Sequence, residues 1–473
     1  MGDRAIVVLD CGKTLAKLSL WRSDGSLIAR ETRPNARVDT GTYVALDSAG
    51  IEAWIAATLR GFASLAPIGA IIPVGHGAGA AIVRDGGLVC PPLDYEDAMP
   101  ADLRRDYDGL RDPFEATGSP ALPDGLNLGA QLYRLQALHP DLLEGGAQIL
   151  PWAQYWAWLL CGVPASELSS LGCHTDLLRP GDASLSDLAR RRGWADHIAP
   201  LAPAGAVLGT ISPQWAERTG LAADVRVHCG LHDSNAALLA ARAFPQIADH
   251  ESTVLSTGTW FVAMRSPADG ATVDISTLPE DRDCLVNVDV FGKAVPSARF
   301  MGGREIEILS GVDSRRVDIR PDQPALLAAV PDLVAAGAMV LPGFASGFGP
   351  FPHGRGRWIG MPTDPFARRA AVCLYAALVA DVSLSLIGSR DRILIEGRFA
   401  EAEVFVRALA TLRPDAEIFV CNAHNDVSFG ALRLLLPELK PACRLTRVMP
   451  LDTDLLAYRA RWLREAERME QAA

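Results

Sequence analysis

Residues 5–14 read AIVVLDCGKT, an apolar β-branched run that ends in a tight turn. The run predicts a buried strand over residues 5–9, because Val and Ile fit a pleated, buried surface well. Beyond the turn, apolar and polar residues alternate over 16–21, and a Ser-Asp-Gly turn precedes a further strand at 27–29. The chain is therefore expected to open with an antiparallel meander of three strands.

The same pattern occurs again much later in the chain. Residues 252–256 form a second strand-like run, Thr257-Gly258-Thr259 supplies a turn, and residues 260–264 form the returning strand. A unit duplicated at such a distance indicates two like-folded halves and not a short-period solenoid. We place the boundary near Phe244-Pro245, which divides the chain into residues 1–245 and 246–473.

Helical and strand-like patterns alternate in both halves. Helices are expected over 52–65, 128–138, 152–161, 185–192 and 367–387, and further strands over 225–229, 393–395 and 418–420. The predicted fold class is therefore α/β.

The bulk properties exclude several classes of protein. Of the 473 residues, 49% are hydrophobic and 21% are charged, which is typical of globular domains and argues against general disorder. The net charge of −11 with scattered Lys and Arg argues against nucleic acid as a partner. No apolar run reaches the roughly 18 residues of a membrane span, and the nine cysteines lack metal-site spacing. We expect a cytoplasmic protein with reduced thiols and no membrane partner. A homodimer is possible.

The first turn has the composition of a phosphate-binding turn. Gly12 would let the backbone approach a phosphate, and the hydroxyl of Thr14 lies beside several backbone amides. Asp10 is placed to hold Mg²⁺, usually through water. Asp and Gly are also the residues that an ordinary hairpin turn prefers, so the motif taken alone could be a turn that binds no ligand. Its repetition at 257–259 favours the functional interpretation.

A second candidate carboxylate follows the strand predicted at 225–229. Asp233 stands where this strand passes into an Ala- and Leu-rich helix, with His232 beside it. Asp233 could serve only as a helix N-cap, which Asp does well. Open α/β folds, however, keep their ligands at the carboxyl ends of strands, which favours a functional role for both residues.

The order of these motifs resembles that of the FGGY carbohydrate kinases, from Val8 to about Leu436. The Asp-Cys-Gly turn, Pro-Asn-Ala at 34–36 and Val-Leu-Ser-Thr-Gly-Thr-Trp at 254–260 look most like the motifs of fuculokinases. The pair His232-Asp233 is similar to that of fuculokinases and rhamnulokinases. The resemblance implies two actin-like (ribonuclease H-like) ATPase domains flanking a central cleft, with the sugar site and the base in the first domain and most of the nucleotide site in the second.

The resemblance also implies an activity. It is the phosphorylation of a small sugar, such as L-fuculose or L-rhamnulose, at a primary hydroxyl, with ATP and Mg²⁺ and with Asp233 as general base. The expected metal ligands are Asp10 and Asp233. The expected substrate contacts are His76, Gly77, Asp94, Glu96 and His232. The expected nucleotide contacts are Gly12, Lys13, Thr14, Lys17, Thr257, Gly258, Thr259, Gly397, Arg398 and Gly430.

Two residues depart from the family pattern. Lys13 stands where a small residue or Thr is usual, and Arg398 interrupts a Gly-Gly pair. Lys13 is predicted to contact a phosphate and Arg398 to stack on adenine, but both fit equally well as solvent-exposed replacements. They motivate the alternative of a sugar-binding regulator that has kept the fold and lost catalysis. A chaperone-like or cytoskeletal ATPase is a further alternative, against which the His232-Asp233 pair argues.

Overall fold

The computed structural model describes residues 4–313, 316–421 and 427–472. Contacts divide the chain into two compact units, which are described separately. The first unit comprises Met1–Ala240, Val286–Ala294 and Asp426–Lys440, and the second comprises Ala241–Leu285, Val295–Asn425 and Pro441–Ala473. The main division lies close to the boundary expected near Phe244-Pro245. It differs from the expected 1–245 and 246–473 because two later segments pack with the first unit.

A mixed sheet forms the centre of the first unit, in the order β12-β13-β6-β1-β2-β3, with β14 beside β6. β1, β2 and β3 are successive antiparallel neighbours, which confirms the predicted meander, and β6 runs parallel to β1. The strands are β1 (Ala5–Cys11), β2 (Leu15–Trp21), β3 (Leu27–Pro34), β6 (Ile68–Gly75), β12 (Val207–Thr210), β13 (Arg226–His228) and β14 (Leu231–His232).

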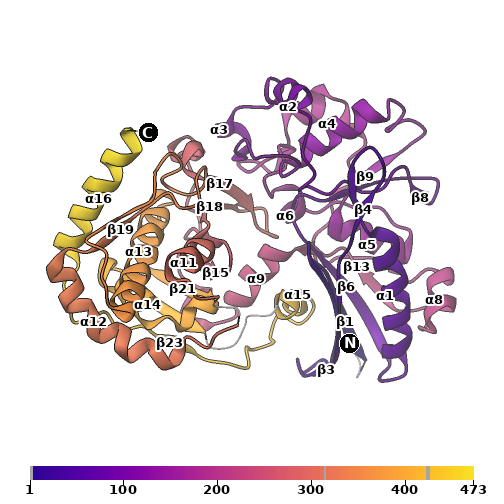
Figure 1. The fold of residues 1–473 in the computed structure, drawn as a ribbon. Helices are drawn as coiled ribbons and strands as arrows, with labels where there is room; N and C mark the ends of the chain where they lie inside the picture. Colours follow the sequence, from indigo (N-terminus) through magenta and orange to yellow (C-terminus); the bar gives the residue numbers. More distant parts are fainter. Residues whose placement is uncertain (1–3, 314–315, 422–426, 473) are drawn as a thin grey trace. The chain divides into compact units, whose positions relative to one another are not determined.

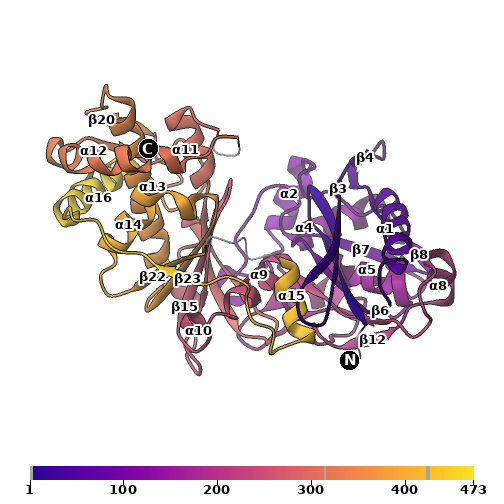
Figure 2. The same ribbon diagram turned by 90° about the horizontal axis from the view of Figure 1, so that it is seen from below.

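Helices cover both faces of this sheet (Figure 1). They are α1 (Ser48–Ala63) and α5 (Trp152–Cys161) on one face, and α9 (Asp233–Ala241) and α15 (Val427–Leu435) on the other. Because side chains alternate along a strand, Val7 and Leu9 of β1 enter the core under α1 and α5, whereas Ile6 and Val8 enter the core under α15. Figure 2 shows α15 against the indigo strands although it lies near the end of the chain. Both core faces of the sheet are thus closed by apolar packing.

A smaller layer of the first unit carries the loops that reach the site. It is built on a three-stranded sheet, β8-β7-β9, and on a separate apolar core. Its elements are β4 (Arg37–Asp39), β5 (Val44–Leu46), β7 (Ala80–Arg84), β8 (Gly87–Leu88), β9 (Gln148–Pro151), β10 (Leu178–Arg179), β11 (Ser184–Leu185), α2 (Ala101–Asp108), α3 (Phe114–Thr117), α4 (Leu128–Leu138), α6 (Leu168–Leu171) and α7 (Asp187–Arg191). α8 (Pro213–Thr219) packs on α1.

The sheet of the second unit has the same topology, in the order β17-β18-β16-β15-β21-β22-β23. β15 is antiparallel to β16 and parallel to β21, as β1 is to β2 and β6. The strands are β15 (Ser252–Thr257), β16 (Phe261–Ser266), β17 (Cys284–Val288), β18 (Ala294–Phe300), β21 (Arg392–Gly397), β22 (Glu417–Cys421) and β23 (Leu445–Arg447). The predicted duplication and the α/β class are confirmed.

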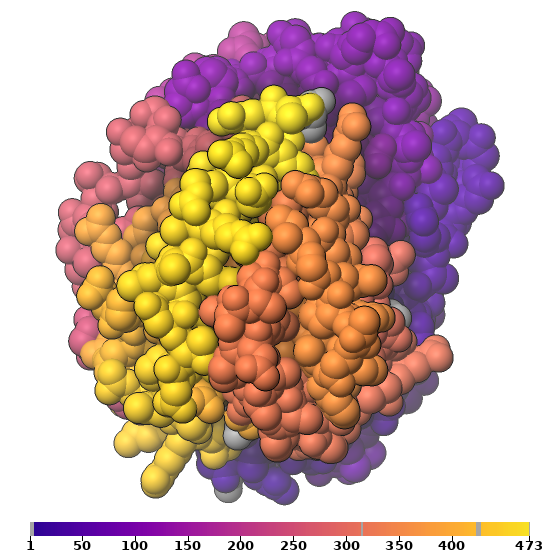
Figure 3. All heavy atoms as spheres, turned by 60° about the vertical axis from the view of Figure 1, so that its left-hand side comes forward, coloured from indigo at the N-terminus to yellow at the C-terminus, as the bar shows by residue number. Residues whose placement is uncertain are grey.

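Helices of the second unit pack around α13, and Figure 3 shows α16 in yellow along the surface of this unit. The remaining elements are α10 (Pro245–Ala248), α11 (Gly302–Ser310), α12 (Gln323–Ala336), α13 (Pro365–Leu386), α14 (Glu403–Leu412), α16 (Leu456–Gln471), β19 (Met339–Leu341) and β20 (Arg357–Ile359). α13 is long and apolar enough to span a membrane, contrary to the expectation from apolar runs, but 78% of its most apolar stretch is buried inside the protein. This burial is that of a core helix. All nine cysteines are unbonded thiols, as expected.

Gly430 supplies a test of how α15 joins the first unit. A Cβ atom at Gly430 would lie 1.7 Å from the backbone oxygen of Ala236 in α9. We therefore expect Gly430→Ala to lower the free energy of unfolding by about 2 kcal/mol or more, because a backbone atom cannot move aside easily. Gly61→Ala is the matched control, since no atom lies within 4 Å of its added Cβ, and it should raise stability by up to about 1 kcal/mol within α1. Urea unfolding measures both, and equal stability of the two variants would contradict this packing.

Candidate active site

The register of three strands builds one edge of the first unit. β1 and β14 both run parallel to β6, and Cys11 and His232 are each paired with Gly75. The carboxyl ends of these strands therefore coincide, and they carry Asp10, His76 and Asp233. This edge is where a sheet of parallel strands can bind a ligand.

The turn between β1 and β2 is tight and its threonine is exposed. The amide of Gly12 donates to the carbonyl of Leu15 at 3.1 Å. Asn35 holds the turn from the side, because its Nδ2 donates to the Gly12 carbonyl at 2.7 Å and its amide donates to the Thr14 carbonyl at 2.9 Å. Thr14 as a residue is exposed, as a phosphate contact requires.

Asp10 and Lys17 form a cross-strand ion pair at the base of this turn. They are register partners on β1 and β2, and Lys17 Nζ lies 3.0 Å from Asp10 Oδ2. The structure brings no group of three His, Cys, Asp or Glu residues together as metal ligands within its described ranges. A single buried carboxylate such as Asp10 still fits Mg²⁺, which takes most of its ligands from water and phosphate oxygens in such sites.

Lys13 lies with the predicted sugar contacts. Its ammonium group pairs with Asp94, lies 3.6 Å from Glu96 Oε2 and sits 4.7 Å from the centre of the Tyr95 ring. Arg37, which sequence reasoning missed, reaches the other oxygen of Asp94 at 2.9 Å. Only 13% of the Lys13 side chain is exposed, so the alternative of a solvent-exposed replacement is wrong for this residue. Lys13 links the phosphate-type turn to the loop that carries Asp94 and Glu96.

Asp233 is a carboxyl group held by donors on one oxygen. Its Oδ1 accepts from the backbone amide of Ser234 at 2.6 Å and lies 3.1 Å from His232 Nε2. Burial raises its pKa, while His76, the bonds from Ser234 and the charge of Lys17 oppose that rise. Its side chain is nevertheless 31% exposed. A carboxylate with a raised pKa that still reaches solvent can accept a proton from a bound hydroxyl group.

Two buried histidines lie close to Asp233. Burial lowers the pKa of His232 to about 4, and burial is also the main cause that lowers the pKa of His76. Nδ1 of His76 lies 2.6 Å from the carbonyl of Gly77, which must accept, so His76 carries its proton on Nδ1. Its Nε2 is buried and has no hydrogen-bond partner among the described residues. Gly77 permits this close packing, because a Cβ there would lie 2.5 Å from Cys173 Sγ and 2.9 Å from His232 Nε2.

Several residues behind His232 gave no signal in the sequence. Ser169 Oγ accepts from the backbone amide of His232 at 3.2 Å and donates to the buried Glu167 at 2.6 Å. Cys173 Sγ lies 3.3 Å from His232 Nε2. These residues are distant from His232 in sequence, and only tertiary packing brings them to it.

The second turn has a different internal structure. The hydroxyl of Thr257 is buried, donates to the Glu396 carbonyl and accepts from the amide of Phe399 at 3.1 Å. This leaves the backbone and the exposed Thr259 as the groups of this turn that can meet a phosphate. Gly397 lies beside it with φ of +87°, and a Cβ there would lie 2.4 Å from the Thr257 carbonyl. Close backbone contact thus accounts for this glycine.

Arg398 and Gly430 lie in different units. Arg398 Nη1 is 3.5 Å from Glu307 Oε1, and its guanidinium is 5.5 Å from the centre of the Phe399 ring. Gly430 belongs to the first unit, where its contact with Ala236 already explains why a glycine is needed. That contact requires no nucleotide.

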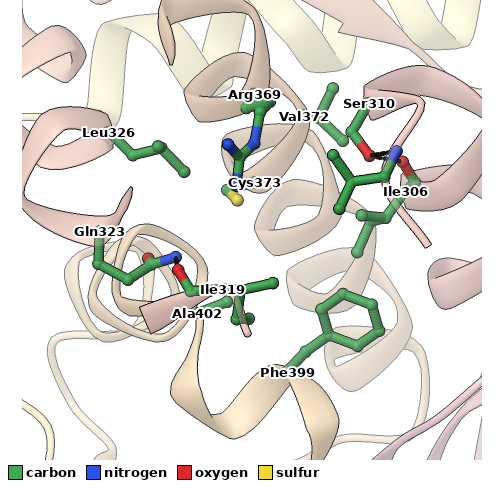
Figure 4. Close-up of a pocket in the computed structure, with 11 residues that line it drawn as sticks. Ile306, Ser310, Ile319, Gln323, Leu326, Arg369, Val372, Cys373, Phe399 and Ala402 are labelled. Atoms are coloured by element: carbon green, nitrogen blue, oxygen red, sulfur yellow. Dashed lines mark hydrogen bonds between the residues drawn. The ribbon is translucent and has the colours of Figure 1, made fainter. Parts of the chain in front are cut away.

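A small apolar cavity lies beside Phe399 in the second unit (Figure 4). Side chains of Ile306, Leu326, Val372 and Phe399 line much of it, and its accessible volume is about 40 Å³. Ser310 Oγ donates to the Ile306 carbonyl at 2.6 Å and Gln323 Nε2 donates to the Ile319 carbonyl at 3.0 Å, whereas Gln323 Oε1 is buried without a hydrogen-bond partner among the described residues. The cavity has room for a few water molecules and would have to widen to hold a purine.

Comparison with known proteins shows which family this chain resembles. Residues 249–442 match the family description "Carbohydrate kinase FGGY, C-terminal domain". The crystal structure of a carbohydrate kinase from Novosphingobium aromaticivorans is 57% identical, with a TM-score of 0.95 over 99% of both chains. A xylulose kinase from Rhodospirillum rubrum shares the fold at 18% identity, with a TM-score of 0.82 over 99% of both chains. An L-fuculokinase from Salmonella typhi is 26% identical over 287 residues, which are 56% of this chain and 57% of that protein. The chain therefore matches little more than half the length of that curated relative.

The lowered pKa of His232 predicts a pH-dependent stability difference. Native His232 stays neutral down to about pH 4, whereas the unfolded chain takes up this proton near pH 6.5, so acid favours the unfolded state. Between pH 7 and pH 5 the wild type should lose about 2 kcal/mol relative to His232→Gln, a variant without this titration. Urea unfolding of both proteins across this range measures the effect. A difference that stays constant with pH would show that folding does not lower the pKa of His232.

Proposed function

The chain belongs to the FGGY carbohydrate kinase family, and on this premise we propose that it transfers the γ-phosphoryl group of ATP to a primary hydroxyl of a small ketose. The observation that carries the proposal is that Asp233 and the Asp10–Lys17 pair both lie at the coinciding carboxyl ends of β1, β6 and β14. Phosphoryl transfer needs positioning and charge neutralisation more than covalent chemistry. This edge offers a base and a cation beside a phosphate-type turn.

Asp233 acts as the general base. As the sugar oxygen bonds to phosphorus and the bond to the ADP oxygen breaks, the hydroxyl proton passes to Asp233. Oδ2 is suited to accept it, because the donors from Ser234 and His232 all approach Oδ1. Such proton transfer contributes about 10²–10⁴ in rate.

The nucleotide contacts follow from the two turns. Gly12, Thr14 and Lys17 would meet the phosphates from one turn, and Gly258 and Thr259 would meet them through the other. Bound Mg²⁺ would neutralise phosphate charge, with Asp10 as the main carboxylate beside it and Asp233 as the second expected ligand. Gly397 and Arg398 would contact the adenosine, although the apolar cavity beside Phe399 would have to widen for the base.

The sugar contacts lie on the side of Lys13. His76 Nε2 is a buried acceptor without a partner in the described protein, so a sugar hydroxyl can donate to it. Asp94 already faces two cations, Lys13 and Arg37, and is better suited to hold Lys13 than to bind sugar directly. The match to L-fuculokinase supports L-fuculose and L-rhamnulose as the first ketoses to test. Neither the geometry nor the similar proteins favour the alternative of a regulator without catalysis.

Replacing the base gives the most direct test of this role. Asp233→Asn should bind sugar with an affinity close to that of the wild type, while turnover falls by about 10²–10⁴. Coupled ADP release over a panel of ketoses measures turnover, and calorimetry measures sugar binding. Asp102→Asn is a control at an exposed carboxylate in α2 and should keep full turnover. Normal turnover of Asp233→Asn would refute the assignment.

Replacing Lys13 and replacing Lys17 should change different kinetic constants. Lys13→Met should raise KM for the sugar by about tenfold, because it releases the loop that carries Asp94 and Glu96, and it should leave KM for ATP within about twofold. Lys17→Met should instead raise KM for ATP and lower kcat. Should Lys13→Met mainly raise KM for ATP, Lys13 would be a phosphate ligand, as its place in the turn suggested.

A further inference from the structure

His232 is buried, and the polar groups that face its two ring nitrogens determine which nitrogen carries the proton. Its Nε2 faces Asp233 Oδ1 at 3.1 Å and Cys173 Sγ at 3.3 Å, and its Nδ1 faces Asn235 Nδ2 at 3.4 Å. Only 6% of the side chain is exposed, so water does not decide where the ring proton sits. A proton on Nε2 would lie between Nε2 and the Asp233 carboxylate, which it stabilises, whereas a proton on Nδ1 would leave the lone pair of Nε2 facing Asp233 Oδ1.

Asn235 decides between these two forms. Its Nδ2 donates to the backbone carbonyl of Val288 at 3.2 Å, and a carbonyl can only accept. This contact fixes which end of the amide is nitrogen, because the flipped amide would place Oδ1 against that carbonyl. The second hydrogen of Nδ2 then points to His232 Nδ1, which must accept it. The same contact excludes an imidazolium ring, since both groups would then be donors.

The oxygen of the Asn235 side chain has no hydrogen-bond partner in the described part of the chain, which indicates that the residue is needed for the two hydrogens on Nδ2. Asn235 is 1% exposed, and its Oδ1 is buried without a hydrogen-bond partner in the described part of the chain. An unpaired buried acceptor is unfavourable, and an apolar side chain of similar size would avoid it. The site therefore keeps an amide whose two hydrogens are used and whose oxygen is not.

We propose that Asn235 is a positioning residue for the base. It holds His232 in the tautomer with the proton on Nε2, so that the N–H group of His232 faces Asp233 Oδ1, and Oδ2 is left for the acceptor hydroxyl. Oδ1 then receives two donors from Ser234, its amide at 2.6 Å and its hydroxyl at 3.2 Å, and lies 3.1 Å from the protonated Nε2 of His232. The catalytic consequence rests on the proposed role of Asp233, but the tautomer does not.

Nuclear magnetic resonance tests the tautomer without reference to activity. Long-range proton–nitrogen spectra of the uniformly ¹⁵N-labelled wild type at pH 7 report which nitrogen of each histidine ring carries the proton. The signals missing from the His232→Gln variant identify His232. We expect a neutral ring protonated on Nε2. A ring protonated on Nδ1, or a charged ring, would overturn the proposal.

A double-mutant cycle tests the consequence for turnover. Asn235→Leu should lower kcat about tenfold, the effect of one misplaced hydrogen bond, with little change in KM for the sugar. A glutamine at position 232 can donate to Asp233 without choosing a tautomer, so Asn235→Leu in the His232→Gln background should change kcat less than about twofold.

The outcomes of the two experiments can be told apart. Equal losses in both backgrounds would show that Asn235 only supports packing and would overturn the proposal. Circular dichroism melting of each variant identifies loss of folding, and in that case the spectra of the wild type still decide the tautomer. Should no ketose be phosphorylated although His232 carries its proton on Nε2, the proposed function fails and the tautomer stands.

Discussion

The site depends on the parallel pairing of β1, β6 and β14. This pairing places Cys11, Gly75 and His232 side by side, although they come from three distant parts of the chain. The register is fixed by burial on both faces of the sheet, because a shift of one residue would exchange the two cores under Val7 and Val8. Asp10, His76 and Asp233 owe their proximity to this register and not to any local motif.

Close backbone packing allows the charged groups to gather at that edge. Gly75 meets the backbone of Ala153 in α5, where a Cβ would lie 2.7 Å from the Ala153 amide nitrogen, and a Cβ at Gly77 would lie 2.9 Å from His232 Nε2. The groups brought together then balance one another. Lys17 faces Asp10, Lys13 and Arg37 face Asp94, and the buried His232 lies beside Asp233. The carboxyl group of Asp233, whose pKa is raised, therefore lies near Lys17, while Lys17 and Lys13 form their ion pairs with Asp10 and Asp94.

The sequence predicted what depends on local pattern. Both hairpins, the duplicated topology and the passage from strand to helix at Asp233 follow from periodicity and turn residues. Pairings across the fold were not predictable. Lys13 was expected at a phosphate but lies against Asp94, the hydroxyl of Thr257 is used inside its own unit, and Gly430 packs on α9 in the first unit. A glycine needed for close packing looks the same in sequence as one needed for a ligand, and Asn235 gives no sign of its partners.

The central claim is that Asp233 Oδ2 faces the acceptor hydroxyl of a sugar whose other contacts lie on the side of His76. A crystal structure with a ketose and a non-hydrolysable ATP analogue tests it most directly. The account predicts the primary hydroxyl oxygen within hydrogen-bond distance of Oδ2, about 2.6–3.2 Å, and in line with the γ-phosphate. A sugar bound away from Asp233, or a hydroxyl group that contacts only Oδ1, would contradict it.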